Sequence, residues 1–172
     1  MRALPIGLLA LGLMGIAPVG VPSPATSTDK IVIGVLDVER TGTAGKTGEI
    51  KKALIKELSQ NTRVKLVDIR ESCNLSDLKK HGYEQADRYK NAYQLDMILH
   101  VHTSALVLGW AYQNPWELDF SLIDLYTKKV KEVSLEINGP PDGLWLRGIS
   151  RKVLVNQDLD RVLRAKKKTL GK

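Results

Sequence analysis

The sequence contains a single cysteine, Cys73, among 172 residues. An intramolecular disulfide is therefore excluded, and the fold must be held together by its hydrophobic core. The thiol is either buried and inert or available to a partner. No cysteine directly follows the apolar N-terminal segment, so the sequence does not predict a lipid anchor on an N-terminal cysteine.

The common signatures of catalysis are also missing. The sequence has no G-x-S-x-G nucleophile elbow, no H-E-x-x-H zinc motif and no calcium-binding loop. Asp96, Asp119 and Asp124 fall at strand edges or on alternating faces, where acids are usually solvated, and their spacing does not pair them. We therefore predict no catalytic residues and no cofactor, and we expect a protein that is not an enzyme.

Residues 1–25 have the features of a secretory signal. Arg2 is followed by an uncharged run over residues 6–21, and small residues lie at positions 23 and 25. The alternative is an uncleaved membrane anchor, although glycines and prolines interrupt the run. Residues 26–30 then form a short linker, and residues 31–172 are long enough for one domain. In either case we expect the domain to be exported to the periplasm or cell envelope.

The net charge of +7 falls to +6 once the leader is removed. A modest basic excess favours anionic surfaces without choosing among them. Peripheral contact with an anionic membrane or wall polymer is therefore an open alternative, whereas we expect no nucleic-acid partner. The Lys166-Lys167-Lys168 run is either a solvated helix end or the place of such a contact.

The first half of the domain alternates between strand and helix patterns. Residues 31–38 form an apolar β-branched run, residues 41–48 form a loop of small residues, and the pattern is helical from Glu49 to Asn61. Residues 64–69 predict a second strand, and the right-handed crossover would make it parallel to the first. A second helical region extends to Tyr93, with an interruption at Gly82.

The second half predicts an antiparallel meander. Its strands are residues 97–112 (long or bulged), 116–126 and 130–137, joined by turns at residues 113–115 and 127–129. Residues 144–167 are helical in character. The order β-α-β-α-β-β-β-α predicts an α/β (α+β) fold, in which helices pack on a mixed sheet of about five strands.

A loop between the first strand and the first helix partly matches a phosphate-binding P-loop. Gly45, Lys46 and Thr47 fit the end of G-x-x-x-x-G-K-[ST], and Gly42 adds to the glycine content. The first glycine of the motif is missing, because Arg40 occupies its position. Binding of a phosphate or nucleotide is therefore an alternative hypothesis, beside a flexible loop that holds an anion weakly at a helix N-terminus.

His100 and His102 lie two residues apart on a predicted strand, so both side chains lie on the same face. Such a pair can contribute to a metal site, but a third ligand is not evident in the sequence. The ordinary explanation is a polar strand face, and metal carriage is a weak alternative.

Aromatic residues cluster around the predicted turn at residues 113–115. Trp110, Tyr112 and Trp116 flank Asn114, the central residue of that turn. Aromatic residues at a hairpin tip serve either packing or binding, and these four residues are the best candidate surface for a partner. The exposed edge of the sheet is a further candidate, because strand addition is easy there.

The order of elements, with several sequence phrases, resembles the small α/β domain shared by three envelope families. These are the TolB amino-terminal region, the CsgG-type curli assembly component and the lipoprotein activators of penicillin-binding proteins. The resemblance is carried by IVIGVLDVE, by residues 53–71, by YQLDMILHVHTS and by FSLIDLYTKKVKEVSLEI. It implies a non-enzymatic envelope domain that works through protein contacts, either with envelope proteins or in a homo-oligomer.

The sequence also departs from these families. It has no lipidation cysteine, no room for a β-propeller or for membrane-inserting hairpins, and no glycine in the turn at residues 126–129. The resemblance therefore implies a fold and a general mode of action, and it assigns no functional residue.

Overall fold

The computed structural model describes residues 30–41, 47–70, 78, 84–108, 111–137 and 146–171, with the side chains of all of these except 41, 105–108 and 111–116. The strands in this part of the chain are β1 (Ile31–Val35), β2 (Glu39–Thr41), β3 (Val64–Asp68), β4 (Met97–Leu108), β5 (Ala111–Asp124) and β6 (Val130–Ile137). The helices are α1 (Thr47–Leu58), α3 (Glu84–Tyr93), α4 (Ile149–Val153) and α5 (Asn156–Leu170).

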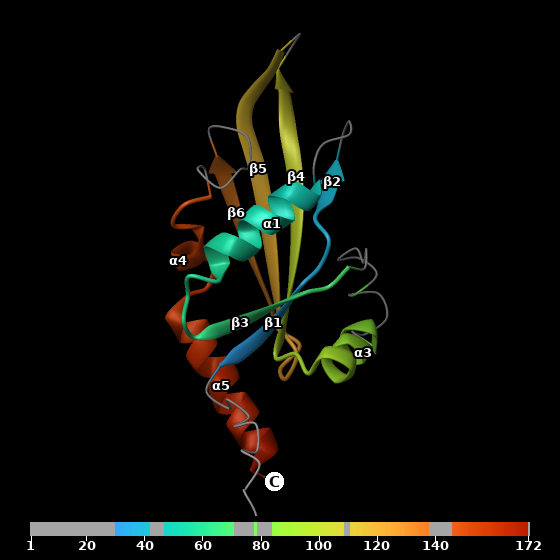
Figure 1. Ribbon diagram of the computed structural model, residues 1–172, viewed down its shortest axis with the longest axis vertical. Coiled ribbons are helices and arrows are strands. Elements are labelled where there is room, and N and C mark those ends of the chain that lie inside the picture. Colours follow the sequence, from blue (N-terminus) through green and yellow to red (C-terminus); the bar gives the residue numbers. More distant parts are fainter. Residues whose placement is uncertain are drawn as a thin grey trace, which may run out of the picture.

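The strands form one mixed sheet in the order β3-β1-β4-β5-β6, and β2 also pairs with β4 (Figure 1). The strands β1 and β3 are parallel, as the right-handed crossover through α1 predicts, and β4, β5 and β6 form the antiparallel meander. The predicted α+β fold is thus confirmed. The extra strand, β2, consists of only three polar residues, so no hydrophobic pattern predicted it.

Each face of the sheet packs against helices. Apolar residues of β1, β4 and β5 pack with α1, α4 and α5 in the larger core, whose centre includes Phe120, Leu54 and Leu159. On the other face, Ile98 and Ile123 pack with Ala86 and Tyr89 of α3. Alternate residues of β4 thus enter different cores, as the two-residue period of a strand requires. The cores explain why the domain needs no disulfide.

The β4–β5 hairpin corrects one predicted turn. Residues 113–115 do not reverse the chain, because they lie inside β5, and Leu108 pairs with Ala111. The register jumps from Ala105↔Trp116 to Val107↔Tyr112, which leaves one β4 residue opposite residues 113–115. This irregularity contains Pro115, which has no N–H to donate to a strand ladder and is therefore confined to edges and bulges.

Two other predicted elements are interrupted. The strand expected over residues 31–38 ends at Val35, and the chain then passes to β2. The helix expected over residues 144–167 is divided into α4 and α5 by Leu154 and Val155, and Val155 has an extended backbone conformation. Leu154 is buried in the larger core, so the break turns an apolar side chain inward without a glycine or proline in the sequence.

Candidate functional site

The hairpin tip, predicted as the partner-binding surface, projects from one end of the molecule (Figure 1). Trp110 lies outside the described residues, whereas Tyr112, Asn114 and Trp116 lie on β5. β5 pairs with both β4 and β6 from Trp116 onward, but residues 111–115 have no pairing with β6. On the other side, the pairing of β2 with β4 ends at Ser104. Within the described residues, the tip of the hairpin is therefore a two-stranded ribbon.

The sequence of this ribbon is unusual for a strand pair exposed to water. No charged residue occurs between His102 and Glu117, and the residues of β4 beyond Ser104 are all apolar. A strand with one face in water normally alternates polar and apolar residues, and isolated two-stranded hairpins are marginally stable. Unprotected edges without charges are also ready to pair with another chain. The ribbon is therefore the best candidate contact surface in the described structure.

The loop that resembles a P-loop is described only at its end. Gly42, Gly45 and Lys46 lie outside the described residues, and Thr47 is the first residue of α1. Binding of a phosphate or nucleotide at this loop stays a prediction.

The two histidines lie on β4, where each faces a carboxylate. The Nε2 atom of His100 is 3.0 Å from Oε2 of Glu39, and Nδ1 of His102 is 3.6 Å from Oδ2 of Asp119. His100 is buried and His102 is half-buried, beside a cavity of about 320 Å³ that Ser121 and Ser134 also line. Among the described residues, no three His, Cys, Asp or Glu side chains are arranged to hold a metal ion.

Asp96 departs most clearly from the prediction that the acids are solvated. Its side chain, directly before β4, is 3% exposed and accepts three hydrogen bonds. Val32 N donates at 2.8 Å and Lys166 Nζ at 2.7 Å to Oδ2, and the Tyr126 hydroxyl donates at 2.6 Å to Oδ1. Lys166 Nζ also donates to the carbonyl oxygen of Lys30. Asp96 therefore links α5, β1 and the chain after β5.

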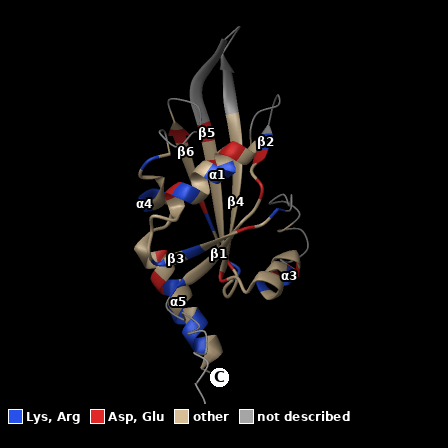
Figure 2. Ribbon diagram, viewed as in Figure 1, with Lys and Arg blue, Asp and Glu red and all other residues tan. Residues whose placement is uncertain are grey.

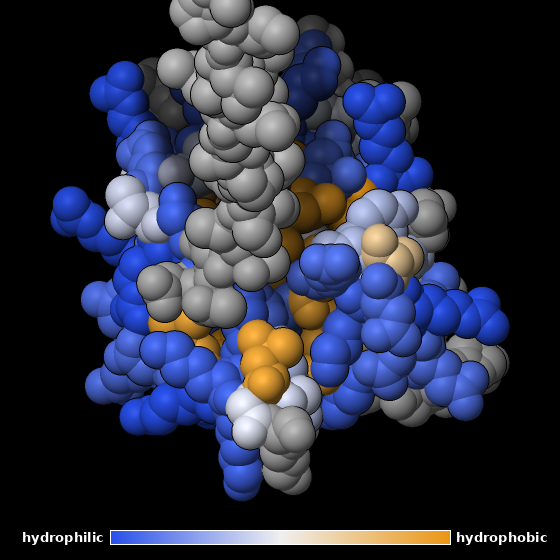
Figure 3. Space-filling view, turned by 60° about the horizontal axis from the view of Figure 1, so that its bottom comes forward, coloured by the Kyte–Doolittle hydropathy of each residue, from blue (hydrophilic) through white to orange (hydrophobic). Residues whose placement is uncertain are grey.

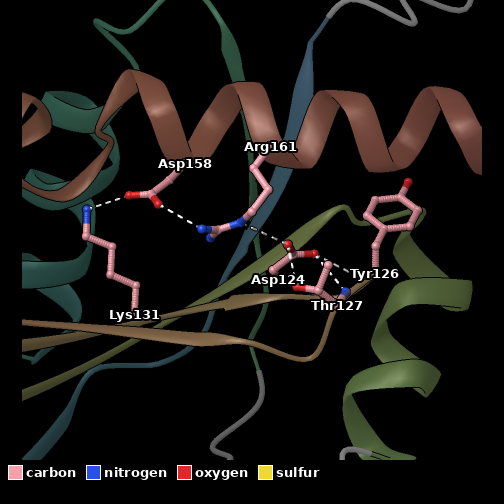
Figure 4. A network of polar contacts seen from close by, with 6 residues as sticks. All are labelled: Asp124, Tyr126, Thr127, Lys131, Asp158 and Arg161. Atoms are coloured by element: carbon pink, nitrogen blue, oxygen red, sulfur yellow. Dashed lines mark hydrogen bonds and ion pairs between the residues drawn. The ribbon is translucent and has the colours of Figure 1, made fainter.

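Asp124 is also buried, contrary to the same prediction, and organises the turn between β5 and β6 (Figure 4). Its Oδ1 accepts the backbone N–H groups of Tyr126 and Thr127, and its Oδ2 accepts the Thr127 hydroxyl at 2.7 Å. Lys128 takes the left-handed conformation in this turn, with φ of 58°, at a position that usually favours glycine. The turn thus forms without the glycine that the family resemblance led us to expect.

The same network continues to α5. Arg161 Nε lies 3.8 Å from Oδ2 of Asp124, and Asp158 lies between Arg161 and Lys131, at 3.3 and 2.7 Å (Figure 4). Together, the Asp96 and Asp124 networks attach α5 to the sheet at two places. Both carboxylates are occupied by donors of the chain itself, which assigns them a structural role.

Tyr126 contributes to this attachment as a hydrogen-bond donor. Burial, and then the hydrogen bond to the Asp96 carboxylate, raise the pKa of Tyr126 far above its ordinary value of 10.0. The hydroxyl therefore stays protonated, and donates to Asp96, throughout the physiological pH range.

Lys51 is a further buried charge that the sequence pattern did not reveal. Its Nζ atom lies 2.7 Å from Oδ1 of Asp37 and 2.5 Å from Oδ1 of Asp68, and it donates to the carbonyl oxygen of Ile69. These contacts fix α1 beyond the ends of β1 and β3. The helical pattern that begins at Glu49 gave no sign of this, because periodicity gives no information on acids elsewhere in the chain.

The basic run at the end of α5 is divided between two roles. Lys166 belongs to the Asp96 network, whereas Lys167 and Lys168 are exposed, so only part of the run is solvated. Leu170 is 65% exposed at the end of the same helix. Basic residues colour this end of α5 in Figure 2, and Figure 3, in which the bottom of the molecule comes forward, shows apolar side chains among a mainly hydrophilic surface. No helix in the described part of the chain is long and apolar enough to cross a membrane.

No protein-family model and no curated protein sequence matches the chain. Among solved structures, the PelC dodecamer from Paraburkholderia phytofirmans is 14% identical and covers 83% of this chain and 91% of its own, with a TM-score of 0.47. The lipoprotein GNA1162 from Neisseria meningitidis is 16% identical, with coverage of 76% and 99% and a TM-score of 0.46. The hypothetical protein CT253 from Chlamydia trachomatis is 9% identical, with coverage of 82% and 95% and a TM-score of 0.40.

These likenesses concern the arrangement of the fold alone and carry no argument about function. None of the three proteins is named as a TolB-type, curli-type or activator-type protein, so that resemblance stays a prediction.

Proposed function

We propose that the chain is a non-catalytic, exported adaptor domain of the cell envelope, which binds a protein partner through the tip of the β4–β5 hairpin. The observation that supports this proposal is the two-stranded ribbon beyond Ser104 and Trp116, which has no charged residue and no third strand in the described structure.

A protein partner would supply hydrogen bonds to the edges of the ribbon. A strand from another chain could add to the free edge of either β4 or β5 and supply main-chain hydrogen bonds, while side chains give specificity. Aromatic residues such as Tyr112 and Trp116 are enriched among residues that dominate binding energy at interfaces. The bulge at residues 113–115 also suits this role, because bulges re-aim strands at functional edges.

The proposed cellular location is inferred from the N-terminal segment. Residues 1–25 have the pattern of a secretory signal, which supports an envelope or periplasmic location for the domain. The buried charge networks support a role without chemistry, because Asp96, Asp124 and Lys51 are engaged in holding helices.

The test adds a charge to the ribbon. We expect Tyr112→Lys to reduce recovery of the envelope partner by at least about tenfold, because an uncompensated charge at the centre of an interface costs more than about 1.4 kcal/mol. The matched control is Thr62→Lys, which adds the same charge at an exposed position after α1. Partner recovery is measured by quantitative mass spectrometry of affinity-purified, crosslinked protein.

Thermal unfolding of both variants shows whether the domain remains folded. Loss of the partner only with Tyr112→Lys, at an unchanged melting temperature, supports the hairpin as the contact. Equal recovery with both variants would show that the tip does not bind the partner.

A further inference from the structure

A large groove lies between α1 and the junction of α4 with α5, on elements different from those of the hairpin tip. Its volume is about 1340 Å³, and it is open to solvent. One wall comes from α1 and the residues directly after it, including Lys56 and Gln60. The other wall comes from residues 147–157, including Arg147 and Arg151.

The groove gathers three cations without counter-charges. Lys56, Arg147 and Arg151 are exposed, and none of them forms an ion pair within the described part of the chain. Elsewhere on the surface, Arg63 pairs with Asp160 and Lys131 pairs with Asp158. Unpaired like charges on both walls of one groove repel each other, and an anion between them would relieve that repulsion.

The one acid among the described lining residues is already occupied. Glu57 is 7% exposed, and its Oε1 accepts the backbone N–H of Gly148 at 2.7 Å. Its Oε2 accepts the side-chain amide of Gln60 at 2.8 Å. Glu57 thus ties α1 to the start of α4 at the floor of the groove, and the three cations outnumber it.

The start of α5 completes the second wall. Val155, Asn156 and Gln157 line the groove there. Asp158 lies in the first turn of α5 and offsets the partial positive charge of this helix end, so the positive potential of the groove comes from its side-chain cations.

We propose that this groove binds an acidic stretch of a protein chain. Its volume exceeds the range of about 300–1,000 Å³ that is usual for small-molecule pockets, which favours an extended polymer. Two arginines suit carboxylates, because the guanidinium fork binds them through paired hydrogen bonds. No aromatic ring occurs among the described lining residues, so the stacking platform that single-stranded nucleic acids use is missing from them.

The test uses the full chain and a fluorescently labelled peptide of alternating glutamate and glycine. We expect saturable binding at low ionic strength, measured by fluorescence anisotropy, that weakens as salt rises. The same peptide with glutamine in place of glutamate should not bind. In the groove variant, Lys56→Gln, Arg147→Gln and Arg151→Gln are combined, and we expect the dissociation constant to rise at least about tenfold.

The matched control removes the same charge from another surface. Arg164→Gln, Lys167→Gln and Lys168→Gln change three exposed residues of α5, none of which lines the groove. We expect the control to weaken binding less than about threefold, because only long-range attraction is lost. Equal weakening by both variants would overturn the proposal, and so would failure of the glutamate peptide to bind the unaltered chain.

Vesicles that contain phosphatidylglycerol test whether the groove binds an anionic lipid surface instead of an acidic peptide. Loss of vesicle binding in the groove variant, without peptide binding to the unaltered chain, would assign the groove to lipid and overturn the proposal. None of these measurements involves the hairpin tip, so their failure would leave the proposed adaptor function standing.

Discussion

Replacing Asp96 with asparagine removes one negative charge and preserves the shape of the side chain. The amide oxygen can still accept hydrogen bonds from Val32 and Lys166, and the amide nitrogen can donate to the Tyr126 oxygen. The substitution therefore isolates the loss of the counter-charge of Lys166, whose side chain is 12% exposed.

Removing one partner of a buried ion pair lowers the free energy of unfolding by about 3–5 kcal/mol. Because its hydrogen bonds are retained, we expect Asp96→Asn to lower it by about 3 kcal/mol. Asp96→Ala also leaves the Val32 N–H without its side-chain acceptor, so we expect a larger loss, of about 5 kcal/mol. Small domains are stable by about 5–15 kcal/mol in total, so either loss is a large fraction of the whole.

The assay is equilibrium unfolding in urea, followed by far-ultraviolet circular dichroism. Asp160→Asn is the matched control, because Asp160 pairs with Arg63 at the surface and should cost less than about 1 kcal/mol. In a double-mutant cycle with Lys166→Met, we expect the two effects to be non-additive by at least about 1 kcal/mol. A cost for Asp96→Asn no larger than that of the control would refute the buried-pair reasoning.

Three further outcomes test other parts of the fold. The folded pKa of Tyr126 exceeds 10.0. The contribution of Tyr126 to stability is therefore complete below pH 10 and is lost as the pH rises further. Tyr126→Phe should flatten the decline of the urea midpoint above pH 10. Gln94, with φ of 53° after α3, should tolerate glycine with a gain of about 0.5–1 kcal/mol, whereas Gln94→Ala should give no gain in the same assay. A Cβ atom at Gly34 would lie 2.5 Å from Ile69 Cδ1 and 2.6 Å from Leu95 Cδ1. Gly34→Val should therefore lower the free energy of unfolding by about 1–3 kcal/mol. An unchanged melting temperature would contradict this packing.

Local periodicity was sufficient to predict much of the fold. The apolar residues of α1, including Ile50, Leu54 and Leu58, are buried at the predicted helical spacing, and the alternation in β6 matches its half-exposed pattern. These features depend only on neighbours in the sequence, because one face of each element meets the core.

The errors arise where distant residues decide the structure. The Asn114-Pro115 pair has the composition of a turn, yet β5 continues through it, because pairing with β4 resumes at Tyr112 and tolerates a bulge. Asp96 resembled a solvated acid because its lysine partner lies 70 residues away in the sequence. The three groove cations come together only when α1 packs beside α4, so spacing could not group them.

The most direct measurement of the adaptor function is crosslinking in intact cells, with a photoreactive amino acid in place of Trp116 and mass spectrometry of the adducts. The control places the same group at Lys65, an exposed residue of β3. We predict one dominant adduct with an envelope protein at position 116 and none at position 65, whereas self-adducts alone would identify a second copy of the chain as the partner. If position 116 gives no adduct while the domain is folded and abundant, or gives the same adducts as position 65, the hairpin tip is not the contact surface.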